Sequence, residues 1–259
     1  MRDMGLDEAI RAAGGVGALA RKIGISQPSV SNWGRIPAER VLAVEAATGV
    51  DRSVLRPDLY SERHPNGGDV EEVDAARAQE YTLLAALLAR APDQSLLDRL
   101  ATLRGDASPL GVAHAALAEA ASRTTAERVE REYFNLFIGL GRGELLPYGS
   151  YYLSGFLHER PLARLRTQLR ELGVERAEGE VEPEDHAAIL CEIMAGLING
   201  RLSATPGADR ELFEKHLSPW IGRFFSDLQQ AEAADFYRNV GTIGRLFMEI
   251  ENEAFALPS

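Results

Sequence analysis

The chain has 259 residues, of which 45% are hydrophobic and 26% charged, as expected for a globular protein of one large domain or two smaller ones. A single cysteine, Cys191, excludes an intramolecular disulfide, and the sequence shows neither a signal peptide nor an apolar run long enough to cross a bilayer. These features predict a cytoplasmic protein without membrane insertion.

The net charge of −11 is unevenly distributed. Residues 1–64 hold nine Lys/Arg and eight Asp/Glu, whereas the remainder holds nineteen and thirty-one. The asymmetry predicts two parts with different partners, the second of which repels nucleic acid and suits a basic ligand.

Residues 1–60 show the helical spacing and the corner of a helix-turn-helix. Gly24 allows the left-handed turn between two helices, Ser26 is suited to cap the next helix, and Val30 is placed to pack back onto the core. The outward residues of that helix can bond base edges, and the nearby cations can meet phosphates. The predicted DNA-binding residues are Gln27, Ser29, Ser31, Asn32, Arg21, Lys22, Arg35 and Arg40.

The segment from Ala20 to Tyr60 resembles the small Cro/YdaS-like phage-type regulators, most clearly in the sequence ISQPSVSNWGRIPAERVLAVEAATGVDRSVLRPDLY. The resemblance implies binding of duplex DNA through residues 1–60. A net charge of +1 is low for a tight DNA binder, so a protein-interaction module is the alternative.

Residues 61–75 are predicted to be a linker, because they are polar, contain Pro65 and Gly67-Gly68, and lack an apolar period. Residues 76–259 show only helical periods and predict an all-helical bundle, so the whole chain is expected to be all-α. Leu212 to Leu228 is predicted to be one helix with its apolar residues on one side.

The stretch from Tyr133 to Tyr152, YFNLFIGLGRGELLPYGSYY, is the most distinctive of the second part. It begins as an amphipathic helix, is interrupted by three glycines, and ends in a loop with three tyrosines. Loops are normally polar, so this aromatic loop is interpreted either as pinned to its own core by the tyrosines or as the rim of a binding site.

A second stretch, Glu182-Pro183-Glu184-Asp185-His186, precedes a long apolar helix. Proline suits a first helical position, and the carboxylates lie where the helix dipole favours them. Asp185 falls outside the predicted apolar faces, and His186 is interpreted as a satisfied core group unless it serves a site.

Together, the two stretches resemble the TorD/DmsD-type chaperones that mature molybdenum enzymes. The Pro-Tyr-x-Ser-x-Tyr form of the family falls on Pro147, Tyr148, Ser150 and Tyr152, and its Pro-x-Asp-His form on Pro183, Asp185 and His186. The resemblance implies a signal-peptide and client site made of Pro147, Tyr148, Ser150, Tyr152, Asp185 and His186.

The partner that this resemblance implies is the catalytic-subunit precursor of a molybdoenzyme, bound by its twin-arginine leader before cofactor insertion and export. Tyr148 and Tyr152 are expected to contact the apolar part of the leader, Asp185 to face its arginines, and His186 to hold the loop. The alternative function is a transcriptional regulator whose TorD-like domain is the sensor. A homodimer is left open.

Catalysis is not expected. The five histidines show no metal-ligand spacing, and Gly139-x-Gly141-x-Gly143 has neither the preceding strand nor the following Lys-Ser/Thr of a phosphate-binding loop. Cys191 lies among apolar residues, where buried packing is the ordinary role. The sequence therefore predicts no enzyme, no resident cofactor and no metal.

Overall fold

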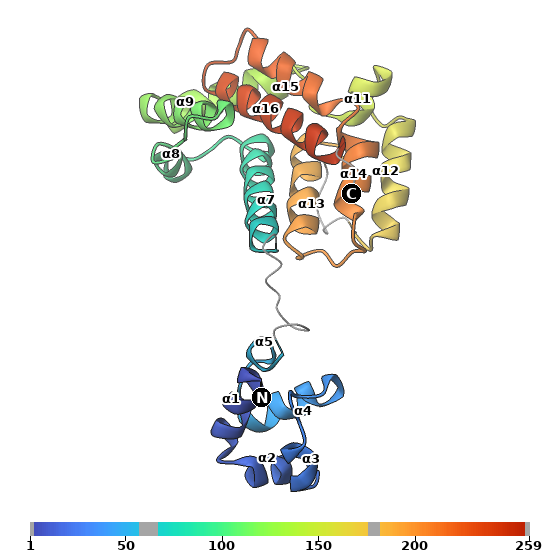
Figure 1. Cartoon of the computed structure of the whole chain (residues 1–259). Coiled ribbons are helices and arrows are strands. Elements are labelled where there is room, and N and C mark those ends of the chain that lie inside the picture. The colour runs from blue at the N-terminus through green and yellow to red at the C-terminus, as the bar shows by residue number, and fades with distance from the viewer. Residues whose placement is uncertain (1–2, 57–66, 176–181, 257–259) are drawn as a thin grey trace. The chain divides into compact units, whose positions relative to one another are not determined.

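The computed structural model describes residues 3–56, 67–175 and 182–256, and the chain divides into two compact units, Met1–Glu72 and Val73–Ser259. Every regular element in the described ranges is helical, which confirms the predicted all-α class (Figure 1). The elements are α1 (Met4–Ala13), α2 (Val16–Lys22), α3 (Gln27–Ser31), η1 (Ala38–Arg40), α4 (Val41–Thr48), α5 (Arg52–Leu55), α7 (Gly67–Ala89), α8 (Gln94–Leu100), α9 (Pro109–Arg123), α10 (Ala126–Tyr133), η2 (Phe134–Ile138), α11 (Gly149–Ser154), α12 (Arg160–Glu171), α13 (Ala187–Ile198), α14 (Ala208–Leu212), η3 (Phe213–Leu217), α15 (Ile221–Gln230) and α16 (Phe236–Ala256).

In the first unit, α2 and α3 meet at the predicted corner. Gly24 has a φ of 69°, and the Ile25 amide donates to the Ala20 carbonyl at 3.0 Å. The Ser26 hydroxyl accepts from the Ser29 amide at 3.3 Å, which caps α3. Val30 is buried in the small core of the unit. The residues chosen for the turn, the cap and the core therefore take the positions that the sequence predicts.

The predicted linker is partly helical, because α7 begins at Gly67, inside residues 61–75. Further along α7, the Arg77 guanidinium bonds Glu251 of α16 at 2.7 Å, which anchors this helix to the bundle. A polar stretch without an apolar period does not reveal such anchoring. Residues 57–66 lie outside the described residues, so the domain limits of 60 and 76 stay a prediction.

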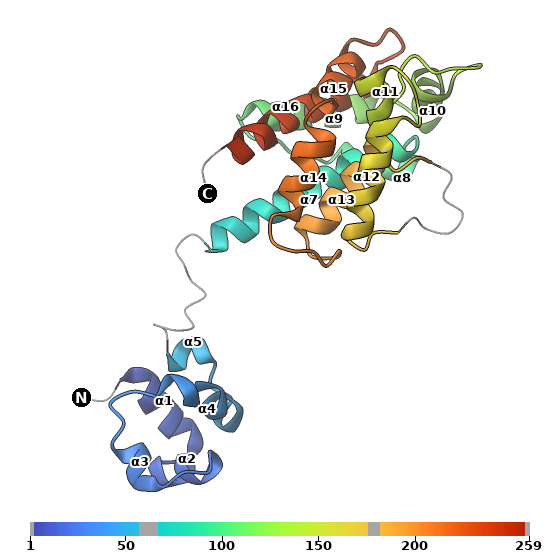
Figure 2. The ribbon, with the colours of Figure 1, turned by 90° about the vertical axis from the view of Figure 1, so that its right-hand side faces the viewer.

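The second unit is a bundle in which α15 and α16 lie side by side, and α12, α13 and α14 group together in both views (Figures 1 and 2). The apolar faces of these helices join one buried core. Gly241 and Gly244 let α16 approach α15 closely, since a Cβ at Gly244 would lie 2.2 Å from the Phe225 ring.

The helix predicted from Leu212 to Leu228 is not continuous. Phe213–Leu217 forms a π-helical turn, η3, in which the Ser218 amide donates to the Phe213 carbonyl, and α15 begins only at Ile221. Pro219 has no amide to donate, so an unbroken ladder across this region is impossible. The apolar spacing alone did not show the interruption.

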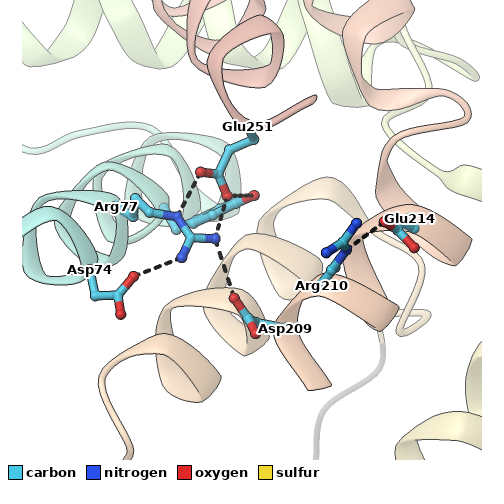
Figure 3. Close-up of polar contacts among 7 residues, drawn as sticks. Asp74, Arg77, Asp209, Arg210, Glu214 and Glu251 are labelled. Carbon is cyan, nitrogen blue, oxygen red and sulfur yellow. Dashed lines mark hydrogen bonds and ion pairs between the residues drawn. The ribbon is translucent and has the colours of Figure 1, made fainter. Parts of the chain in front are cut away.

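Arg77 anchors the beginning of the second unit (Figure 3). Its guanidinium bonds Glu251 of α16 at 2.7 Å and Asp209 of α14 at 3.3 Å, and the Tyr81 hydroxyl donates to Glu251 at 3.0 Å. The Glu251 side chain is 1% exposed. A buried carboxylate needs such partners, so this cluster fixes α7 against α14 and α16.

Candidate functional site

The two stretches that resemble the chaperone motifs lie against each other, although 30 or more residues separate them. The Ala187 amide donates to the Pro147 carbonyl at 2.8 Å, and the Gly149 amide donates to the Asp185 carbonyl at 2.9 Å. Tyr148 and His186 form an antiparallel bridge. The chain therefore brings the beginnings of α11 and α13 together at one backbone junction.

Asp185 supports this junction with its side chain. Its Oδ2 accepts from the Ser150 amide at 2.7 Å at the beginning of α11, and the residue is 3% exposed. A carboxylate at a helix N-terminus satisfies an otherwise unbonded amide. The sequence places Asp185 outside the apolar faces, whereas the structure buries it, because its partner comes from a distant segment.

His186 is the N-cap of α13. Its Nδ1 accepts from the Ala188 amide at 3.1 Å, and its ring lies edge-on to the Tyr148 ring at 5.1 Å. The side chain is 7% exposed. These contacts are those of a histidine that holds local structure together.

The loop tyrosines bond to the bundle through their hydroxyls. Tyr148 donates to Glu182, and Tyr152 donates to Asp227 at 3.0 Å. Burial, followed by the neighbouring carboxylate, raises the pKa of both hydroxyls. The Tyr152 ring lies 5.6 Å from that of Trp220. Both tyrosines thus pin the loop to its own core, and the exposed apolar residues of the region are others, including Leu140 at 97%.

Two of the predicted site residues, Tyr152 and Asp185, line different cavities. Tyr152 lines a cavity of about 430 Å³ with Arg223 and Asp227. Asp185 lines another of about 350 Å³, in which Arg160, Arg164 and Lys215 supply positive charge. Basic neighbours disfavour a guanidinium ligand, so this geometry favours a supporting role for Asp185 over the arginine-facing role that the sequence predicts.

Another cavity, of about 650 Å³, lies between α12 and α13, and none of the six predicted residues lines it. Its lining combines an apolar floor with carboxylates and arginines. One ion pair, Arg166 to Glu184 at 2.8 Å, crosses from α12 to the segment before α13. The apolar residues are Leu169, Val174, Ile189, Ile193 and Leu202, and the carboxylates are Glu175, Glu182, Glu184 and Glu192.

Sequence reasoning missed this cavity for a specific reason. The helix dipole is a sufficient reason for the carboxylates that precede α13, and within the otherwise apolar run Ala187 to Ile198 the sequence carries one charged residue, Glu192. The charged residue within an otherwise apolar run was the available signal, because such a residue must face solvent or a partner. Glu192 is exposed at the cavity, whereas its neighbours Cys191 and Ile193 are buried.

The eight predicted DNA-binding residues are all exposed on the first unit. Arg21 and Lys22 form the last turn of α2, and Asn32 ends α3. Ser29 is partly engaged, since its hydroxyl bonds that of Ser26 at 2.7 Å. The exposed ones are Arg21, Lys22, Gln27, Ser29, Ser31, Asn32, Arg35 and Arg40.

Within the described ranges, no group of three or more His, Cys, Asp or Glu side chains is placed to hold a metal ion. Burial raises the pKa of the Cys191 thiol to about 12, so this cysteine is a poor nucleophile. In the same ranges no helix combines the length and the apolar character needed to cross a bilayer.

Residues 104–226 match the family described as nitrate reductase delta subunit, and residues 6–64 match the family described as bacterial toxin YdaS. The chaperone protein TorD of Vibrio cholerae is 28% identical over 127 residues, and the Tat proofreading chaperone DmsD of Salmonella paratyphi A is 32% identical over 124 residues. Each alignment covers 46% of this chain and 58% of the relative, so the chain spans little more than half the length of these proteins.

A crystal structure of a proposed redox enzyme maturation protein from Archaeoglobus fulgidus matches with a TM-score of 0.45 and 21% identity, over 67% of this chain and 93% of that one. The named curated relatives are chaperones rather than enzymes, in agreement with the prediction of no catalysis. The resemblance drawn from the sequence is thus confirmed: the second unit is similar to the TorD/DmsD-type chaperones, and the first unit is similar to the YdaS family.

Proposed function

We propose that this protein is a cytoplasmic chaperone for a molybdenum-containing redox enzyme, and that it binds the twin-arginine leader of the precursor in the cavity between α12 and α13. The observation that carries the proposal is the pairing of an apolar floor with four carboxylates in a cavity of about 650 Å³. A twin-arginine leader is a basic segment followed by an apolar one, so it is complementary to both features.

The carboxylates of this cavity are better placed for the arginines than Asp185 is. Glu192 is exposed and has no ion pair with another described residue, and Glu184 is shared with Arg166. A guanidinium can bond a carboxylate in a two-pronged geometry at a site of this kind. Arg166, Arg170 and Arg201 also line the cavity and limit how many positive charges it accepts.

The motif residues act as the frame of this site. The backbone bonds of Pro147 and Asp185 fix the start of α13, whose residues Ile189 and Ile193 form part of the cavity floor. Tyr148 bonds Glu182, which lines the cavity. Four of the motif residues contribute to client binding by holding helices in place, namely Pro147, Ser150, Tyr152 and His186. Tyr148 contributes by positioning Glu182.

Calorimetric titration with a twin-arginine leader peptide tests the proposal. Glu192→Gln removes a cavity charge and is expected to weaken binding several-fold at low salt and little at high salt. Ile189→Ser removes apolar contact and is expected to weaken binding at every salt concentration. Glu130→Gln, at an exposed carboxylate of α10 that lines none of the cavities described above, is the control. Parent-like affinity of both cavity variants contradicts the site.

A second candidate function, sequence-specific DNA binding by the first unit, is supported by the exposure of all eight predicted contact residues around α2 and α3. In this alternative the protein is a transcriptional regulator, in which the first unit binds DNA and the second unit is the sensor. Selection of bound duplexes by residues 1–66 is expected to yield a preferred sequence, which Gln27→Ala with Asn32→Ala abolishes while weak, salt-sensitive binding persists. No preference for any duplex favours the interaction-module alternative.

A further inference from the structure

A second polar cleft of the larger unit lies between α12 and η3, away from the proposed leader site. It consists of two cavities of about 350 and 370 Å³ that share Arg164, Lys215 and His216 in their linings. Arg160, Arg164 and Gln168 are four residues apart along α12, which places them in one row on the helix surface. We call this feature the α12–η3 cleft.

Positive charge is concentrated at one end of the cleft. Arg160 and Arg164 are exposed and have no ion pair with another described residue, whereas Lys215 pairs with Glu211. Glu171 and Glu211 line only the second cavity, and Arg160 lines only the first. Asp185, the one carboxylate of the first cavity, accepts from the Ser150 amide through Oδ2, and its Oδ1 is buried without a hydrogen-bond partner among the described residues. The Arg160 end is therefore basic in a unit that is acidic overall.

A buried hydrogen-bond donor faces the same cleft. Gln168 is 7% exposed, and its Oε1 lies 2.8 Å from the His216 Nε2. Its Nε2 is buried and has no acceptor among the described residues, and the residue lines the second cavity. Buried amide donors are almost always bonded, so a donor left open in a cavity that Arg164 and Lys215 also line is suited to an oxygen acceptor from outside the chain.

The π-helical turn explains how the opposite wall is formed. In η3, Phe213 and Leu217 remain buried in the core, while Lys215 and His216 line the cleft. Such turns insert one extra residue into a helix and are frequent at functional sites. Burial first, and then the charges of Lys215 and Arg164, lower the pKa of His216, so this ring is neutral near pH 7 and adds a polar wall without adding charge.

We infer that the α12–η3 cleft binds a small oxyanion, a free phosphate or the phosphate group of a monoester, through Arg164, Lys215 and the open amide of Gln168, with Arg160 adding positive charge from the first cavity. Arginine and lysine are the ordinary phosphate ligands, and the amide adds a neutral donor of fixed direction. The carboxylates of Glu171 and Glu211 also line the second cavity, and their negative charge limits the site to a single anionic group. This site is independent of the client and of the leader peptide.

The test is calorimetric titration of the full chain with inorganic phosphate in a chloride background. Saturable binding is expected, and Arg164→Gln is expected to weaken it at least about tenfold, since a charged donor is lost. Gln168→Leu, which keeps the bulk and removes the donor, is expected to weaken it several-fold. Arg128→Gln, at an exposed arginine of α10 that lines neither cavity, serves as the matched control and is expected to bind like the parent.

Glycerol 3-phosphate in a parallel titration distinguishes the two sources of the group. Equal affinity assigns the site to phosphate alone, and tighter binding assigns it to a monoester whose body contacts Leu153 and Pro219 of the first cavity. Thermal melting checks that each variant folds. If Gln168→Leu does not fold, Arg164→Gln is the decisive variant, because Arg164 is exposed. The inference is overturned if phosphate gives no saturable heat, or if Arg164→Gln binds as tightly as Arg128→Gln.

Discussion

Asp185 shows how one residue of a recognised motif can serve the frame of a site rather than its ligand. Its carboxylate is buried and accepts from the Ser150 amide, while its carbonyl accepts from the Gly149 amide. The bond to the Ser150 amide joins residues that lie 35 positions apart in the sequence. A carboxylate can accept hydrogen bonds either from an arginine or from the unbonded amides at a helix N-terminus. In this structure Asp185 accepts from an amide at the beginning of α11.

We therefore expect Asp185→Ala to lower the free energy of unfolding by about 1.5–3 kcal/mol, because a buried hydrogen bond to a charged group is lost. Asp185→Asn keeps an acceptor oxygen for Ser150 and is expected to cost less. Urea denaturation followed by circular dichroism measures both. Asp98→Asn, at an exposed carboxylate of α8, is the control, expected to change stability by less than about 0.5 kcal/mol. A stability loss for Asp185→Ala no larger than that of the control contradicts the supporting role.

His114 links α9 to α7 and gives a pH dependence of known sign. Its Nε2 lies 3.0 Å from Glu80, and the hydrogen bond to this carboxylate raises the pKa of His114 above 6.5. A raised folded pKa means that the contribution of His114 to stability is fully present below the unfolded pKa and is lost as pH rises through the folded one.

The stability advantage of the parent over His114→Gln is thus expected to be largest near about pH 6 and to shrink toward about pH 8. His216 has the opposite sign, since burial lowers its pKa and protonation opposes folding. His216→Gln should then gain on the parent as the pH falls below its ordinary pKa of 6.5. Urea midpoints across this range measure both differences. Parallel curves for the parent and His114→Gln would show that the Glu80 contact has no effect.

At the scale of elements, the close approach of α15 and α16 depends on two glycines of α16. A Cβ at Gly244 would lie 2.2 Å from the Phe225 ring, and one at Gly241 would lie 2.6 Å from the Gln229 amide nitrogen. Neither glycine has a positive φ, so the requirement is for space and not for an unusual backbone. Phe225 is fully buried and has little room to move.

Gly244→Ala is expected to destabilise the protein by about 1–3 kcal/mol, because the added methyl group overpacks this crossing. Gly222→Ala is the matched control, since Gly222 lies in α15 and a Cβ there would meet nothing within 4 Å. Alanine is the better helix former, so this control is expected to be neutral or stabilising by up to about 1 kcal/mol. Thermal denaturation measures both. Equal melting temperatures of Gly244→Ala and the parent would mean that α15 and α16 move apart enough to accommodate the added methyl group without loss of stability.

At the scale of the whole molecule, two units with separate cores carry different charges. The core around Leu6, Leu19 and Val30 contains only residues of the first unit, and the core of the bundle contains only residues from Tyr81 onward. Separate cores allow separate unfolding, and a ligand that binds one unit stabilises that unit by mass action.

Calorimetry of the full chain is expected to show two unfolding transitions. A twin-arginine leader peptide should raise only the transition of residues 73–259, and a selected duplex only that of the first unit. Chains cut within residues 57–66 provide the control, since each fragment should retain its own transition. If the leader peptide also shifts the transition of the first unit in the intact chain but not after the cut, the units are coupled and the sensor alternative gains support.

The sequence by itself determined the features that depend on residues close together in the chain. Gly24, Ser26 and Val30 specify a turn, a cap and a core position because each depends only on the backbone within a few residues. The helical periods specified the all-α class, and two short motifs indicated the chaperone resemblance, because residue type at fixed spacing is visible in a linear chain.

Only the tertiary structure decided what depends on distant partners. It buried Asp185 against Ser150, began α7 at Gly67 within the predicted linker, and replaced part of a predicted helix by η3. It also placed Glu182, Glu184 and Glu192 around one apolar floor. A cavity is formed by the packing of separate helices, and the spacing of residues within each helix does not encode which faces meet.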